Sequence, residues 1–313
     1  MRQHSSFIGI FVICCGFLTN GSNALAAPET WVSGTGTDAG NCPITAPCRT
    51  FAFAHTQTNN NGAINVLTSG NFGPLTITKP ISIVADGVEA VINTATDVAA
   101  ILVQAGGGAV ISLRGLTIDM RGTVNDGIGF VSGGALHVQN CLIRKAGSGI
   151  LFLPASGTPE LYVADSVIAD ASGTASVSVQ PTGSAGAKVV FDRVRVENSA
   201  EIGIFVVGQS TTGSISATVR DSVVAGNSGT GIFALGDGGG ATTVTVDHTA
   251  SVSNSTGIRA SGAGATLRIG DSTVSGNATG LFTSSSGVIE SYGTNKIDGN
   301  GTDGTPTSTI AMK

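Results

Sequence analysis

The fold is decided by residues 217–235, whose sequence is ATVRDSVVAGNSGTGIFAL. Three short apolar runs in this stretch are separated by two turns, at Asp221-Ser222 and at Gly226-Asn227. The runs are rich in β-branched residues and too short for helices, whereas Asp, Gly and Asn favour turns. The glycine-rich residues 236–241 then return the chain to the start of the next unit. The stretch therefore predicts three strands joined by two tight turns and one return loop.

The same unit recurs from about residue 109 to the C-terminus. Eight copies begin near Ala109, Ala135, Leu161, Lys188, Ala217, Thr243, Thr266 and Ile289. The residues expected to point inward on the second strand are Ile118, Ile143, Ile168, Val196, Val224, Val252, Val274 and Ile297, spaced 22 to 28 residues apart. Such a short period, filled with Val, Ile, Gly and Asn, is typical of a β-solenoid and excludes a helical repeat.

The predicted fold class is all-β, a single-stranded parallel β-helix over residues 63–313. Shorter runs at residues 64–67, 75–78, 81–84, 90–93 and 100–103 extend the pattern before residue 109, which brings the expected number of turns to nine or ten. Each turn contributes three strands, and the helix is expected to be right-handed because parallel crossovers have that hand.

The N-terminal region predicts export. Residues 1–26 combine Arg2 in front, an apolar run and a small-residue site at residues 24–26, as in a secretion signal. The apolar run is too short for a permanent span, so we expect a secreted, periplasmic or extracellular protein with no membrane span after cleavage. Removal of Arg2 with the signal would leave 14 basic and 20 acidic residues, which disfavours a nucleic-acid partner. We also expect a monomer.

Residues 27–62 are expected to form an irregular lead-in and a cap. Cys42 and Cys48 flank a short proline-containing loop, and an oxidising compartment favours a disulfide between them. A two-cysteine metal site is the alternative, with His55 as its nearest partner. Residues 48–61 predict a short helix that covers the first turn, because an uncapped solenoid would expose its core and a strand edge.

Polar residues recur at both predicted turns. Asparagines at the second turn predict a structural hydrogen-bonded ladder, with a polar ligand row as the alternative; they are Asn198, Asn227, Asn254, Asn277 and Asn300. Aspartates at or near the first turn predict caps on backbone N–H groups, with a Ca²⁺ row as the alternative; they are Asp165, Asp192, Asp221 and Asp271. The three histidines of the mature chain, His55, His137 and His248, lie in different units and are expected to be structural or exposed.

With these repeats in place, the chain resembles exported bacterial right-handed β-helix proteins of the pectate-lyase-like fold. The resemblance covers essentially the whole mature chain and rests on APCRTF (residues 46–51), GPLTITKPISI (residues 73–83), the Val-x-Asp-Ser repeats and NGTDG (residues 300–304). It implies the fold but no single activity, because members of this fold cleave acidic polysaccharides with Ca²⁺ and a basic residue, hydrolyse galacturonans, or bind without chemistry.

One mixed-charge patch is the candidate for chemistry under this resemblance. β-Elimination needs cations beside a uronate carboxylate and a base for the adjacent proton. The candidates for the catalytic cations and base are Arg144, Lys145 and Arg195, and those for binding are Asp119, Arg121, Asp170 and Glu197. Asp119, Asp170 and Glu197 would hold Ca²⁺, a cofactor expected only for a lyase. The alternative is that these charges are solvated surface pairs of little energetic value.

The absence of a recognisable catalytic set favours a non-enzymatic role. We expect a glycan-binding or structural module at or outside the cell envelope, with a polysaccharide or cell-surface glycan as partner. The alternatives are a Ca²⁺-dependent polysaccharide lyase and an adhesion or host-contact protein. Trp31, Tyr162 and Tyr292 are the only aromatic residues besides phenylalanine, which counts against a processive polysaccharide enzyme.

Overall fold

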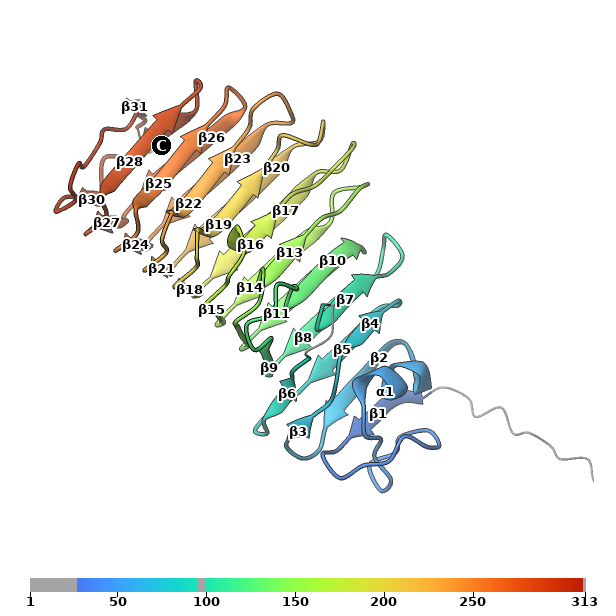
Figure 1. Cartoon of the computed structure of the whole chain (residues 1–313). Helices are drawn as coiled ribbons and strands as arrows, with labels where there is room; N and C mark the ends of the chain where they lie inside the picture. Colours follow the sequence, from blue (N-terminus) through green and yellow to red (C-terminus); the bar gives the residue numbers. More distant parts are fainter. Residues whose placement is uncertain (1–26, 95–98, 312–313) are drawn as a thin grey trace, which may run out of the picture.

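The chain winds into a β-solenoid, as Figure 1 shows for the computed structural model. The structure describes residues 27–94 and 99–311, so the expected secretion signal lies outside the described residues. Strands stack into three sheets, and every strand pair is parallel, which confirms the predicted all-β parallel solenoid. The described residues contain one helix, α1 (Phe51–Gln57), at the blue end of the rod.

The three sheets have twelve, ten and nine strands and are called sheets A, B and C here. Sheet A consists of β1 (Ala27–Val32), β2 (Thr58–Val66), β5 (Ile81–Val84), β8 (Val110–Arg114), β11 (Ala135–Gln139), β14 (Glu160–Ala164), β17 (Ala187–Asp192), β20 (Ile215–Arg220), β23 (Thr242–Asp247), β26 (Ala265–Gly270), β29 (Val288–Ser291) and β31 (Ser308–Thr309). Sheet B consists of β3 (Gly70–Asn71), β6 (Ala90–Ile92), β9 (Leu116–Asp119), β12 (Leu142–Arg144), β15 (Val167–Ala169), β18 (Arg195–Glu197), β21 (Val223–Ala225), β24 (Ala250–Val252), β27 (Thr273–Ser275) and β30 (Lys296–Ile297). Sheet C consists of β4 (Leu75–Ile77), β7 (Ile101–Gln104), β10 (Ile128–Ser132), β13 (Ile150–Phe152), β16 (Ala175–Val179), β19 (Ile202–Val207), β22 (Thr230–Leu235), β25 (Thr256–Ser261) and β28 (Thr279–Ser284).

The interior row of sheet B is the one predicted from the repeat, with one correction. The row includes Ile118, Ile143, Ile168, Val196, Val224 and Val274, all with no exposed surface. In β24, however, Ser251 pairs with Val224 and is buried, whereas Val252 pairs with Ala225 and faces outward, so the assignment of Val252 to the interior was wrong. Ser251 fits inside because its hydroxyl donates to the carbonyl of Gly257 at 2.8 Å. Ile297 is in register with Val274 but only partly buried, since β30 is the last strand of the sheet.

The first corner, between sheets A and B, uses a left-handed backbone residue followed by a small inward one. The left-handed residues have φ between 45° and 53° and are Asn140, Asp165, Arg193, Asp221, His248 and Asp271. Hydroxyl groups, not the aspartates, accept the N–H of the preceding rung; they belong to Ser166, Ser222, Thr249 and Ser272. The predicted capping role of the aspartates is therefore wrong. Asp165, Asp221 and Asp271 are exposed, whereas Asp192 is buried at the end of β17.

The second corner, between sheets B and C, carries the asparagine ladder. Asn227, Asn254, Asn277 and Asn300 form it, and each side-chain oxygen from Asn254 onward accepts both N–H groups of the preceding asparagine at 2.8 to 3.2 Å. Asn198 is not a member: it is exposed with φ 57°, and Ser199 takes the inward place and donates its N–H to Asn227. The prediction for Asn198 was wrong by one residue, because its rung has Asn-Ser where the next has Gly-Asn.

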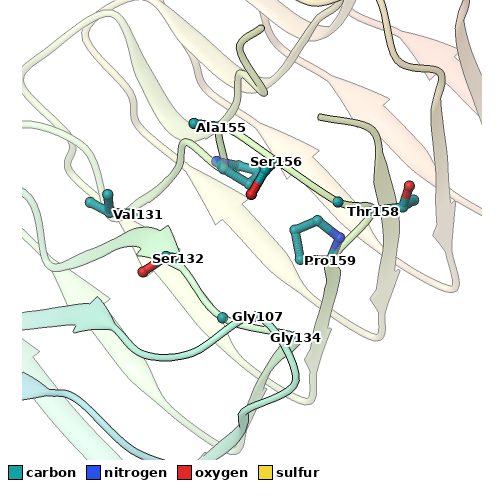
Figure 2. Close-up of a pocket in the computed structure, with 11 residues that line it drawn as sticks. Gly107, Val131, Ser132, Gly134, Ala155, Ser156, Thr158 and Pro159 are labelled. Atoms are coloured by element: carbon teal, nitrogen blue, oxygen red, sulfur yellow. The ribbon is translucent and has the colours of Figure 1, made fainter. Parts of the chain in front are cut away.

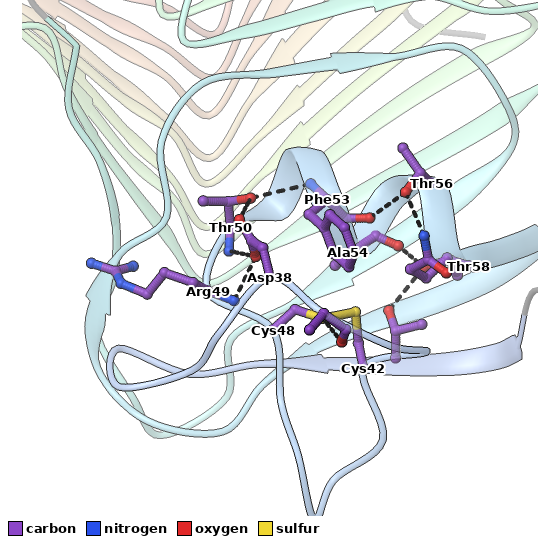
Figure 3. Close-up of a disulfide and its surroundings, with 12 residues drawn as sticks. Asp38, Cys42, Cys48, Arg49, Thr50, Phe53, Ala54, Thr56 and Thr58 are labelled. Carbon is purple, nitrogen blue, oxygen red and sulfur yellow. Dashed lines mark hydrogen bonds between the residues drawn. A yellow bond between two sulfur atoms is a disulfide. The ribbon is translucent and has the colours of Figure 1, made fainter. Parts of the chain in front are cut away.

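The N-terminal cap is fixed by a disulfide and by capping side chains (Figure 3). Cys42 and Cys48 are bonded to each other, and the carboxylate of Asp38 accepts the backbone N–H groups of Arg49 and Thr50 at 2.8 and 2.9 Å. The Thr50 hydroxyl in turn accepts the N–H of Phe53 and so caps α1. Residues 27–32, expected to be irregular, form β1, which adds a further strand to sheet A beside β2.

The helix ends four residues earlier than expected because the chain enters β2 at Thr58. The Thr58 hydroxyl donates to the carbonyl of Ala54 at 2.7 Å and lies 2.8 Å from the hydroxyl of Thr30 in β1. These two contacts join α1 to the first two strands of sheet A. The cap is thus one unit with the first turn of the solenoid.

Acid is expected to weaken this cap through His55. Burial first, and then Lys79, lowers the pKa of His55 from 6.5 to about 4, and its Nε2 accepts the N–H of Thr78 at 3.4 Å. The unfolded chain therefore binds a proton between pH 6.5 and 4 that the folded chain rejects, so stability falls as the pH falls through this window. The loss is about 3 kcal/mol, complete below pH 4.

Urea unfolding of the protein and of His55→Gln between pH 7 and pH 4 measures this loss. Glutamine does not titrate in this range, so the difference between the two unfolding curves isolates His55 from the carboxylates. Parallel declines in the two proteins would show that His55 does not carry the effect.

Candidate functional site

The predicted patch lies on the outer face of sheet B, and its charges pair with one another. Asp119 in β9 is next to Arg144 in β12, with a carboxylate-to-guanidinium distance of 2.9 Å. Arg195 and Glu197 form a second ion pair within β18. Ala169 stands between Arg144 and Glu197 in the same row and separates the two pairs.

The remaining patch residues lie at the second corner. Lys145 and Asp170 occupy its left-handed positions on successive rungs, and the Asp170 carboxylate accepts the amide of Asn198 at 3.4 Å. Arg121 meets Asp119 through its backbone N–H, at 3.0 Å. The structure thus brings the patch residues onto neighbouring rungs, but it does not gather the three carboxylates Asp119, Asp170 and Glu197 into a metal-binding group.

A hollow that was not predicted lies on the outer face of sheet A, across β11, β14 and β17. Its volume is about 400 Å³, and we call it the outer hollow. The side chains that line it include those of His137, Gln139, Glu160, Tyr162, Lys188 and Val190. The rings of His137 and Tyr162 meet edge to face with centroids 6.0 Å apart. Glu160 and Lys188 form an exposed ion pair of 3.4 Å at one edge. The ring of Tyr162 therefore lies in the same hollow as a hydrogen-bond acceptor, Glu160, and a hydrogen-bond donor, Lys188.

The buried carboxylate of Asp192 holds Tyr162 in place. Asp192 is 2% exposed, and its Oδ2 accepts the Tyr162 hydroxyl at 3.3 Å and the guanidinium groups of Arg193 and Arg220 at 2.7 and 3.1 Å. This carboxylate raises the pKa of Arg220. Because Tyr162 is anchored at its hydroxyl, its ring presents a fixed surface to the hollow.

A second hollow lies just before the start of β11 and β14, as Figure 2 shows. Residues 131–134 and 154–159, together with Gly107, line this space of about 330 Å³; we call it the side-loop hollow. Pro159 lines the side-loop hollow and the next residue, Glu160, lines the outer hollow, so the two hollows share neighbouring residues of the chain where β14 begins. Val131, 41% exposed, adds an apolar surface to a lining that carries no charged side chain.

Phenylalanines after the second corner divide between the two faces of sheet C. Phe130 and Phe152 stack inside the tube with ring centroids 4.4 Å apart. Phe205 and Phe233 stack on the outer face at 4.9 Å, and the Arg259 guanidinium lies 4.5 Å from the centroid of Phe233. These outer rings pack on one another and on an arginine, so they reinforce the sheet.

The reactive groups outside these hollows are a buried cysteine and the charged side chains at the first corner. Cys141 is buried, and burial raises the pKa of its thiol to about 11, which makes it a poor nucleophile. At the first corner, a hydrogen bond from Arg193 lowers the pKa of the Asp165 carboxyl, and a hydrogen bond to Asp247 raises the pKa of His248. In the described part of the chain, one group of metal-ligating side chains comes together, made of Asp247, His248 and Asp271.

No family model, curated protein or solved structure matches this chain. The described residues contain no helix that is long and apolar enough to cross a membrane, since α1 has seven residues. The outer hollow was missed in the sequence because none of its residues belongs to a motif. The repeat could have revealed part of it, because His137 and Tyr162 occupy the same position in successive units and are therefore neighbours on sheet A.

Proposed function

We propose that this protein is an exported β-helix that binds a glycan across the outer face of sheet A. The fixed ring of Tyr162 in the outer hollow carries this proposal. An aromatic ring face stacks on a pyranose ring face, and the anchored hydroxyl means that little conformational freedom is lost when it does so.

The polar groups around Tyr162 suit sugar hydroxyls. Glu160 accepts hydrogen bonds, Lys188 donates them, and Gln139 does both, all within the same hollow. The side-loop hollow continues the surface with small and apolar residues, which a second sugar unit can approach closely. Export is supported by the signal-like residues 1–26 and by the disulfide of the cap.

The proposal is of binding and not of cleavage. In the sheet B patch, Arg144 forms an ion pair with Asp119 on the neighbouring rung, and Arg195 forms one with Glu197 on the same strand. A lyase would need these cations to face a substrate carboxylate. Formation of unsaturated uronate from an acidic polysaccharide, abolished by Arg144→Ala, would instead support a lyase at that patch.

A glycan array probed with the mature chain, followed by calorimetric titration of the best ligand, tests the proposal. Tyr162→Ala is expected to weaken binding at least tenfold, or about 1.4 kcal/mol, because the stacking surface is lost. Tyr162→Phe keeps the ring and should retain more of the affinity than Tyr162→Ala.

Thr218→Ala is the matched control for this experiment. Thr218 lies in the same outward row of sheet A, next to Val190 and outside the outer hollow. It should leave the affinity unchanged. Equal loss in the Thr218 and Tyr162 variants, or no loss in either, would count against the outer hollow as the binding surface.

A further inference from the structure

The group Asp247, His248 and Asp271 is assembled by two successive rungs of the first corner. Asp247 is the last residue of β23, His248 follows it at the corner, and Asp271 occupies the same corner position one rung later. His248 and Asp271 both have φ 45°, and both are exposed. One donor atom from each of the three residues lies within 4.8 Å of the others.

The charge around this group differs from that around Asp165 and Asp192, which lie on earlier rungs. Asp165 is neutralised by Arg193, through two contacts of 2.7 and 2.9 Å, and Asp192 by Arg193 and Arg220. Within residues 27–94 and 99–311, no arginine or lysine forms an ion pair with Asp247 or Asp271. The contact made by Asp247 is with His248 Nδ1, at 3.0 Å. Two carboxylates thus face one imidazole.

The absence of a side chain at Gly270 lets the ring of Tyr292 pack beside Asp247. Gly270 follows Asp247 in its row on sheet A, where earlier rungs carry Gln139 and Arg220. A Cβ at Gly270 would lie 3.4 Å from Asp247 Oδ1 and 3.1 Å from the ring of Tyr292. A side chain at this position would crowd the Tyr292 ring, so glycine allows this ring to form one wall beside the Asp247 carboxylate.

We propose that Asp247, His248 and Asp271 form a binding site for a borderline divalent transition ion, with Zn²⁺ as its representative. Zn²⁺ combines imidazole nitrogen with carboxylate oxygen in small coordination shells. Two carboxylates balance its charge, and water completes the shell because the site is exposed. Ca²⁺ fits less well, since it requires six to eight oxygen ligands and gains nothing from an imidazole.

Titration of tag-free protein with Zn²⁺ by calorimetry, and with Co²⁺ by visible absorption, tests the site. His248→Asn and Asp271→Asn are each expected to lower the Zn²⁺ affinity tenfold or more and to remove the Co²⁺ spectrum of the site. Asparagine suits both positions, because Asn140 occupies the same corner with φ 51°. Circular dichroism without metal should therefore be unchanged.

Asp165→Asn is the matched control, since it removes a carboxylate from the same corner but outside the group. It should bind Zn²⁺ like the unmodified protein. Equal Zn²⁺ affinity in His248→Asn and the unmodified protein, or Ca²⁺ binding that is as tight as Zn²⁺ binding, would overturn the proposal. The site is distinct from the outer hollow, so Tyr162→Ala should bind Zn²⁺ normally whether or not the glycan proposal holds.

Discussion

Val224→Asp is expected to lower the free energy of unfolding by about 4 kcal/mol or more. Val224 has no exposed surface and lies between Val196 and Ser251 in the interior row of sheet B. A carboxylate there would be buried between Val196 and Ser251 and would lose its hydration. Urea denaturation followed by far-ultraviolet circular dichroism measures the loss.

Ala225→Asp is the matched control, one residue further along β21. Ala225 faces outward between Glu197 and Val252, so its carboxylate would remain hydrated. The expected change in the free energy of unfolding is within about 1 kcal/mol. If both variants were equally unstable, the assignment of inward and outward faces on sheet B would be incorrect.

Asn254→Ala is expected to lower the free energy of unfolding by about 3 kcal/mol. The Asn254 side chain accepts two N–H groups of Asn227 and donates to the carbonyl of Val224 and to Asn277. Asn254 is 4% exposed, so the backbone groups that lose their partner would have no access to bulk water. Each buried unpaired group costs about 1–3 kcal/mol. Urea unfolding of the variant gives the value.

Asn198→Gly tests whether the ladder position, and not asparagine itself, carries this energy. Asn198 is exposed with φ 57°, and the next rung has Gly226 at the same place with φ 66°. The variant should therefore unfold at nearly the same urea concentration as the unmodified protein. A loss comparable to that of Asn254→Ala would mean that the ladder extends to Asn198.

The interior of the solenoid was predictable because alternation and repeat reinforce one another. Ile143 and Val224 are each the apolar residue of a short run that recurs at the same phase, and both are buried. The prediction failed at Ser251-Val252, where the repeat was aligned one residue too late and Val252 was placed inside instead of Ser251. Alternation could not reveal that Ser251 would satisfy its hydroxyl inside, since its partner, the Gly257 carbonyl, belongs to the next strand.

The candidate site was less predictable because it depends on the alignment of outward side chains. Asp119 and Arg144 were expected in one row and do meet. The outer hollow combines residues from three rungs. Asp192, which binds the Tyr162 hydroxyl, was predicted to be a corner aspartate, but it is the last residue of β17 and is buried. Burial of a single carboxylate depends on the side chains stacked over it, which a one-dimensional pattern does not contain.

The asparagine ladder gives the protein a way to change its length by duplication. Each rung offers the same acceptor to the rung before it and the same donors to the rung after it, and only the last, Asn300, turns to a different acceptor, the carboxylate of Asp303. Copying one whole unit, such as the 23 residues 254–276, would lengthen the rod by about 4.8 Å and leave both ends as they are. Copying part of a unit would misalign every row beyond it.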